Sequence, residues 1–202
     1  MSSDGRFAIL NPLGMWEMDT LNVYSVSTTN IGHWAPGNDE WLNHCQAVDG
    51  QRWCVQAYPQ PADSGRMLPT TILTPTEWAN DNHPSWLNDE PGVYVPFCLA
   101  NYRVGGGAIQ RAWDNEIICV DSRPGGDTVW RFAHTRTTGS NWVNLPRGNV
   151  AQDGRFYMYE SDWEGTIGRV DVFVVELASA GPVDPTPPNI SNVQASIITS
   201  SG

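Results

Sequence analysis

Three of the four histidines recur at a nearly constant interval along the chain. His33 and His83 are 50 residues apart, and His83 and His134 are 51 residues apart. Imidazole nitrogens bind Zn, Mn, Fe or Cu, so three histidines that converge would hold a divalent cation, although no fourth ligand stands out. The same recurrence suits a structural role, in which each imidazole forms a hydrogen bond that holds a loop. We expect the structural role and no cofactor, with metal binding at these histidines and direct catalysis as the alternatives.

Two pairs of carboxylates are each separated by a single residue: Asp114 and Glu116, and Asp162 and Glu164. A glycosidase needs two carboxylates about 5–10 Å apart across the scissile bond, and either pair supplies residues of the right type. Carboxylates near turns more often accept backbone N–H bonds or pair with arginine. These four residues are the catalytic candidates, and the structural interpretation is the one that we expect.

Six of the ten tryptophans fall into two groups. Three begin Trp-aliphatic-Asn triplets, and their recurrence predicts packing between repeats: Trp41, Trp86 and Trp142. Others do not recur and flank polar loops. Because aromatic faces stack on the apolar faces of sugar rings, these residues and a nearby arginine are the ligand-binding candidates: Trp34, Trp113, Trp163 and Arg111.

The four cysteines contain no C-x-x-C pair, so a zinc knuckle or a thioredoxin-type motif is not expected. An even number permits two disulfides in three connectivities. We predict the local pairs Cys45–Cys54 and Cys98–Cys119, with four buried thiols as the alternative. Disulfides persist in oxidising compartments, so this prediction favours an extracellular or periplasmic location.

The charge of the chain excludes several classes of partner. There are 22 acidic and 11 basic residues, and all the basic residues are arginine, which gives a net charge of −11. Binding to phosphate backbones or anionic membranes requires clustered basic residues, so we expect no nucleic-acid partner. No apolar run approaches the roughly 18 residues of a membrane span, so no membrane insertion is predicted, and no signal-peptide pattern is found.

The elements that position these residues are short β-strands. Runs rich in β-branched and aromatic residues alternate with Asp-Gly, Pro-Gly and Gly-Gly turns, which is typical of an all-β fold. The only helical candidate is a single turn at Thr76–Asn80. The predicted strands are Arg6–Leu10, Leu21–Ser27, Trp53–Tyr58, Thr70–Thr74, Val93–Phe97, Glu116–Val120, Val129–Ala133, Phe156–Tyr159 and Val170–Leu177.

An internal repeat selects a β-propeller among the all-β folds. In each repeat a histidine is followed by a Trp-aliphatic-Asn triplet, a turn and then strands, and we predict that each triplet is an innermost strand. A period of about 40–55 residues is typical of propeller blades. The N-terminus enters this series in mid-repeat, because Asp4–Phe7 has the same four residues as Asp153–Phe156. Residues 1–177 thus predict three to four blades, as part of a larger propeller rather than a four-bladed ring.

The composition changes after Leu177. Residues 178–188 are rich in proline, alanine and glycine, which predicts an extended linker. Residues 189–202 alternate like a first strand but stop where a second strand is expected, so we expect the sequence to be a piece of a longer protein.

Several of these segments resemble known families. Asp153–Phe156, with Ser161–Trp163 and Asp171–Leu177, resembles the final blade of bacterial TolB-like or WD-type propellers. Residues 188–202 resemble the opening of a fibronectin type III module of large secreted bacterial proteins. The three histidines are similar to the axial metal site of oligogalacturonate-lyase-type propellers, whereas Gly32-His33 resembles the structural Gly-His of WD repeats. These resemblances imply a propeller but fix no reaction.

Two functions of different classes follow. The first is an extracytoplasmic binding or scaffold module that contacts a glycan or a protein, alongside further blades or domains of its parent. The second is a polysaccharide lyase or glycoside hydrolase with an axial metal or carboxylate site. The enzyme requires convergent histidines or carboxylates, whereas the binding module requires only a solvent-facing aromatic patch.

Overall fold

The computed structural model describes twelve ranges of the chain: residues 1–2, 4–10, 14–24, 34–38, 40–47, 50–58, 70–77, 82–102, 113–123, 128–139, 142–165 and 168–177. At some of these residues only the backbone is described, namely residues 10, 43–47, 50–52, 70–77, 82 and 142.

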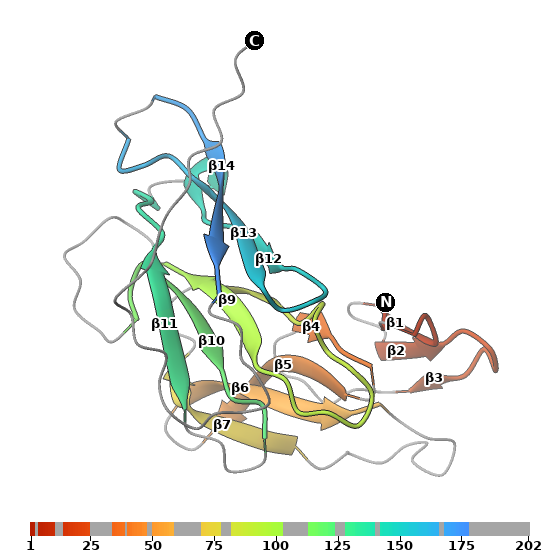
Figure 1. Ribbon diagram of the computed structural model, residues 1–202. Coiled ribbons are helices and arrows are strands. Elements are labelled where there is room, and N and C mark those ends of the chain that lie inside the picture. Colours follow the sequence, from red (N-terminus) through yellow and green to blue (C-terminus); the bar gives the residue numbers. More distant parts are fainter. Residues whose placement is uncertain are drawn as a thin grey trace. The chain divides into compact units, whose positions relative to one another are not determined.

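The described chain is all-β and forms four small antiparallel sheets (Figure 1). The first sheet consists of β1 (Phe7–Leu10), β2 (Gly14–Glu17) and β3 (Val23–Tyr24). The second consists of β4 (Trp34–Pro36), β5 (Glu40–Ala47), β6 (Gly50–Ala57) and β7 (Thr70–Glu77). The third consists of β8 (Asn82–Ser85), β9 (Phe97–Asn101), β10 (Glu116–Val120) and β11 (Val129–His134). The fourth consists of β12 (Gly148–Val150), β13 (Phe156–Ser161) and β14 (Asp171–Glu176). A 3-10 turn, η2 (Trp142–Asn144), precedes β12.

In every sheet the hydrogen-bonded neighbours are strands that follow one another in sequence, so each sheet is a simple meander. The strand sequences explain the burial of these elements. β13 alternates buried Tyr157 and Tyr159 with exposed Met158, as expected for a strand with one face in a core. β10 is apolar and β-branched from Ile117 to Val120 and is buried on both faces.

The chain divides into two compact units. Unit 1 consists of residues 1–79, 89–96 and 121–127, and unit 2 consists of residues 80–88, 97–120 and 128–202. In unit 1, the first sheet packs against the second through one cluster of buried residues. Phe7 stacks on Tyr58 at 4.8 Å between ring centroids, and Trp41 of β5 is fully buried in the same cluster.

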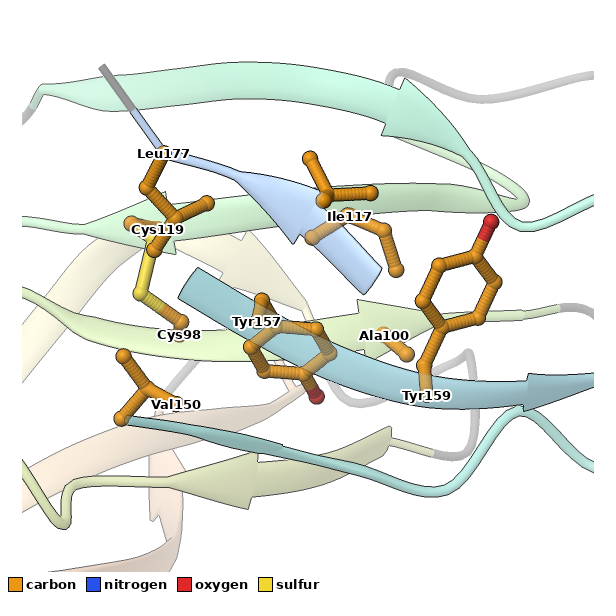
Figure 2. Packing of buried hydrophobic residues seen from close by; sticks show 9 residues of the cluster. Cys98, Ala100, Ile117, Cys119, Val150, Tyr157, Tyr159 and Leu177 are labelled. Atoms are coloured by element: carbon orange, nitrogen blue, oxygen red, sulfur yellow. A yellow bond between two sulfur atoms is a disulfide. The ribbon is translucent and has the colours of Figure 1, made fainter. Parts of the chain in front are cut away.

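In unit 2, the third sheet packs against the fourth (Figure 2). Cys98 and Cys119 on neighbouring strands form a disulfide in the centre of this core, which confirms one of the two predicted pairs. Tyr157 and Tyr159 of β13 belong to the same buried cluster. Cys54 in β6 is also disulfide-bonded, but the side chain of Cys45 is not described, so the pair Cys45–Cys54 remains a prediction.

Asp4–Phe7 and Asp153–Phe156 adopt the same turn. In each, the aspartate carboxylate accepts a hydrogen bond from the arginine N–H, at 2.9 and 3.0 Å. The glycines have φ of 77° and 69°, a conformation that glycine adopts without steric cost. Each arginine lies over the following phenylalanine ring, at 4.5 and 5.4 Å. Each phenylalanine pairs across the sheet with a glutamate, Glu17 or Glu176. The match between the two Asp-Gly-Arg-Phe segments is therefore seen in the backbone, and β1 and β2 correspond to β13 and β14. The sequence pattern also matched Leu21–Ser27 to the strand that begins near Val170, and this part is wrong, because β2 takes that place.

The prediction that all three Trp-aliphatic-Asn triplets are strands is wrong for two of them. The first triplet lies in β5, whereas the second forms a turn after β8 and the third forms η2. An innermost strand would bury the aliphatic residue of its triplet, but Leu87 is 52% exposed and Val143 is 67% exposed. Neither of these side chains is covered as a strand in a core would require.

Two further predicted elements are also corrected. Val93 forms only an isolated bridge with Glu90, and β9 begins at Phe97, where the predicted strand ends. The expected helical turn at Thr76–Asn80 begins inside a strand, since β7 continues to Glu77.

Candidate functional site

One end of unit 2 gathers most of the residues that the sequence analysis selected. β8 and β10 begin at this end, and β9, β11 and β13 finish there. The Thr135 N–H donates to the Asn115 carbonyl at 2.7 Å, and the Tyr159 hydroxyl donates to the His134 carbonyl at 3.4 Å. We call this region the loop end of unit 2. The candidates that lie at it are His83, Trp113, Asp114, Glu116, His134, Asp162, Trp163 and Glu164.

The backbone of the loop end is unusually strained. Within the described ranges, six residues other than glycine have a positive φ, and five of them lie here: Trp113, Asn115, Arg136, Trp163 and Glu164. A positive φ is costly for bulky side chains and occurs where the surrounding structure imposes it. Such residues cluster at functional sites, so the strain singles out this end of the unit.

A tight turn at Asp162–Gly165 connects β13 to the segment before β14. Trp163 and Glu164 occupy its two central positions with φ of 48° and 60°, as in a type I′ turn. The Gly165 N–H donates to the Asp162 carbonyl at 2.9 Å, and the Trp163 N–H donates to the Ser161 hydroxyl at 3.0 Å. The turn therefore fixes the direction of the Trp163 side chain.

Asp162 attaches this turn to the neighbouring loop and to η2. Its carboxylate is buried and accepts the Thr138 N–H and the Asn144 side-chain amide, each at 2.8 Å. The Thr138 hydroxyl donates to the same carboxylate. With these donors, Asp162 has the hydrogen bonds of a structural anchor rather than of a proton donor facing substrate.

Trp163 and three neighbours form a surface that we call the Trp163 platform: Arg136, Trp163, Glu164 and Phe173. The Trp163 ring stacks on Phe173 at 4.9 Å between centroids, with the planes 23° apart. The Arg136 guanidinium lies 5.9 Å from the Trp163 ring centroid and 3.0 Å from the Glu164 carboxylate. The two charged side chains are about half exposed and Trp163 is partly buried, so a partly accessible aromatic ring has a donor and an acceptor next to it.

The second candidate tryptophan, Trp113, is partly buried, as Trp163 is. The Trp113 carbonyl accepts the Asn101 side-chain amide at 2.8 Å, and the next residue, Asp114, is fully buried. Glu116 is also buried and pairs with the exposed Arg131 through two hydrogen bonds, one of them 2.6 Å long. The carboxylates of this segment are therefore not displayed together toward solvent.

The described histidines do not form a metal centre with the carboxylates around them. His83 stacks on Tyr102 at 6.2 Å between centroids, and His134 is exposed at the end of β11. In the part of the chain that the structure describes, no three His, Cys, Asp or Glu residues are grouped to hold a metal ion. His33 and Arg111 lie outside the described residues, so their roles remain predictions.

Trp34 belongs to unit 1, whereas the candidates at the loop end belong to unit 2. It belongs to β4 and packs, partly buried, against the cluster around Phe7 and Trp41. This position is that of a core-anchoring residue. In contrast, Arg136 and Phe173 were missed by sequence reasoning, because neither recurs nor stands in a motif, and only the turn geometry brings them to Trp163.

No protein-family model matches the chain, and no curated protein is significantly similar to it. Over the described ranges, no helix has the length and apolar character needed to cross a membrane.

Proposed function

We propose that this chain is an extracytoplasmic binding module built from β-propeller blades, and that the Trp163 platform binds a neutral glycan. The observation that supports this most directly is the platform itself. Trp163 is held by a strained turn and by Phe173, the Arg136 guanidinium lies over its ring, and Glu164 pairs with that arginine. A fixed aromatic face with a planar donor and an acceptor nearby suits a sugar ring, whose apolar face stacks while its hydroxyls form hydrogen bonds.

The negative charge of the chain favours a neutral ligand. The chain has a net charge of −11, which repels polyanions over distances of about a Debye length, roughly 8 Å at physiological salt. The single arginine of the platform is already paired with Glu164. A neutral polysaccharide is therefore the class of ligand that fits best.

The propeller is supported by the order of the sheets. Four meanders of three or four strands follow one another along the chain, as propeller blades do. Within each unit, consecutive sheets pack face to face through apolar clusters. We also propose that the blades are of the TolB-like or WD type and that a fibronectin type III module begins after them. The residues of that module lie outside the described ranges.

The extracytoplasmic location is supported by the Cys98–Cys119 disulfide. Disulfides are rare in reducing compartments. Catalysis is disfavoured by the bonds of the carboxylates, since Asp162 and Glu116 are held in structural hydrogen bonds and Glu164 pairs with Arg136.

Binding to neutral polysaccharides tests the proposal. We expect retardation of the chain in native gels that contain galactomannan, xyloglucan or mixed-linkage β-glucan, and Trp163→Ala should weaken binding at least about tenfold. Trp163→Phe should retain part of the affinity because it keeps an aromatic face. Tyr94→Ala is the matched control, since Tyr94 is a half-exposed aromatic residue of unit 1.

Three results would overturn the proposal. The first is wild-type chain that binds none of these polymers, and the second is Trp163→Ala that folds and binds like wild type. The third is the release of new reducing ends or unsaturated products from the polymer, which would establish the enzyme instead.

A further inference from the structure

A second tryptophan with a strained backbone lies at the loop end of unit 2. Trp113 has a φ of 69°, and Asn115 has a φ of 58°. Asp114 between them is fully buried, whereas Trp113 and Asn115 are only partly buried. The turn is therefore anchored from the inside while part of the tryptophan remains accessible. We call Trp113–Asn115 the Trp113 turn and Asp162–Gly165 the Trp163 turn.

Both turns bond to the same backbone segment, which follows β11. The Thr135 N–H and hydroxyl donate to the Asn115 carbonyl of the Trp113 turn, at 2.7 and 3.3 Å. The Glu164 N–H of the Trp163 turn donates to the carbonyl of the next residue, Arg136, at 2.5 Å. Backbones joined in this way lie about 5 Å apart, and consecutive residues about 3.8 Å apart. Asn115 and Glu164 are therefore within roughly 14 Å of each other, which is within reach of one short oligosaccharide.

The shared segment displays polar side chains between the two turns. His134 and Arg136 are exposed, whereas the alternate residues Thr135 and Thr137 are buried. Imidazole and guanidinium groups both form hydrogen bonds with hydroxyls. Two partly accessible aromatic rings are thus joined by a strip that can bond to the hydroxyls of a sugar.

We propose that Trp113 is a second subsite for the glycan, so that the loop end of unit 2 binds an extended stretch of a neutral polysaccharide rather than a single sugar residue. This inference rests on the proposed function of the Trp163 platform.

The residue type at the strained positions supports this second subsite. Glycine or asparagine would adopt a positive φ at lower cost than tryptophan. The backbone of the two turns therefore gives no reason for tryptophan at position 113 or 163, and bulky residues in such conformations cluster at functional sites. A surface with two subsites binds longer ligands more tightly, because one ligand engages both subsites at once.

Titration calorimetry with manno- and cello-oligosaccharides, from the disaccharide to the hexasaccharide, tests the second subsite. We expect the wild-type affinity to rise at least about tenfold along the series that binds. Trp113→Asn should abolish this rise and leave the binding of the shortest ligands unchanged, whereas Trp163→Ala should weaken binding at every length. Leu21→Asn is the matched control, since Leu21 of unit 1 also has a positive φ, of 60°, and is exposed.

Urea unfolding separates this role from a structural one. Asparagine tolerates the φ of Trp113, so we expect Trp113→Asn to unfold at the same or a higher urea concentration than wild type. A lower midpoint together with weaker binding at every length would assign Trp113 to packing and overturn the second subsite.

Two further outcomes separate this inference from the function on which it rests. A wild-type affinity that is equal at every length, or a Trp113→Asn variant that keeps the wild-type rise, would overturn the second subsite and leave the Trp163 platform intact. Wild-type chain that binds neither the oligosaccharides nor the polymers would overturn the proposed function and this inference with it.

Discussion

At the scale of single residues, the loop end of unit 2 depends on Asp162. This buried carboxylate joins the Trp163 turn to Thr138 and to Asn144 of η2. The three segments come from different parts of the chain, and their strained residues are stable only while these bonds hold them. A single side chain therefore sets the position of the Trp163 platform.

Replacing Asp162 should be costly. Asp162→Ala leaves the Thr138 N–H and the Asn144 amide without their acceptor, and each lost bond to a buried donor costs about 1–3 kcal/mol. We expect the free energy of unfolding in urea to fall by about 3 kcal/mol. Asp162→Asn should cost less, since one amide oxygen still accepts a bond.

Asp153→Ala is the control for this change. The Asp153 carboxylate accepts the backbone N–H of Arg155, and this bond lies at an exposed turn. Its replacement should change the free energy of unfolding by about 0.5 kcal/mol. Equal costs for the two alanine variants would show that Asp162 does not anchor the loops.

At the scale of elements, the disulfide reinforces a hairpin with a long connection. Cys98 and Cys119 are directly opposite each other on β9 and β10. Only five residues on each strand hold this pair of strands together. The covalent bond lies in the core between the third and fourth sheets, so it supports both the hairpin and the surface on which β13 packs.

Removing this bond should destabilise unit 2. The sequence separation of 21 residues corresponds to a loop-closure contribution of about 3 kcal/mol. We expect the double variant Cys98→Ala, Cys119→Ala to lose roughly that amount in urea unfolding under non-reducing conditions. A loss well below about 1 kcal/mol would mean that the β9–β10 pairing is already fixed by packing alone.

Element prediction from the sequence succeeded where local signals agree with the tertiary environment. The strand at Glu116–Val120 was predicted with its observed bounds, because four consecutive apolar residues there have few alternatives. The prediction of a helical turn after Pro75 was wrong because of where Pro75 lies in the sheet. Pro75 lies on the outermost strand of the second sheet, beside a register shift between Arg52 and Trp53. Edge strands and bulges are the places where a sheet tolerates proline.

At the scale of the whole molecule, the candidate site could be predicted only in part. Trp163 was selected because it does not recur, and the structure leaves it partly exposed next to Arg136 and Glu164. Its partners Arg136 and Phe173 were not selected, because residues 27 and 10 positions away come together only through sheet packing and a turn with positive φ. Bulky residues rarely adopt that conformation, so no sequence rule anticipates it.

The buried tyrosines of both units predict a common response to alkali. Burial raises the pKa of Tyr58 and Tyr157 far above the usual value, and it raises the pKa of Tyr159 to about 12. The folded chain therefore retains these protons at a pH where the unfolded chain releases them, near pH 10. Between neutral pH and about pH 10 these tyrosines should not change the free energy of unfolding, which should decrease as the pH rises toward 12.

Urea unfolding between neutral pH and about pH 12, with tyrosinate absorbance recorded in parallel, tests this prediction. Tyr159→Phe should flatten the decrease, since it removes one of the three protons. Complete ionisation of all six tyrosines near pH 10 without loss of stability would contradict it.

The two ends of β13 lead into turns of different kinds. Its beginning is fixed by a turn that the first sheet repeats in sequence, backbone conformation and ion pairing. Its other end leads into the tight turn at Asp162–Gly165, which carries Trp163. Exchange of the Trp163 turn for other short turns is therefore a natural route to new ligand specificities on the same framework.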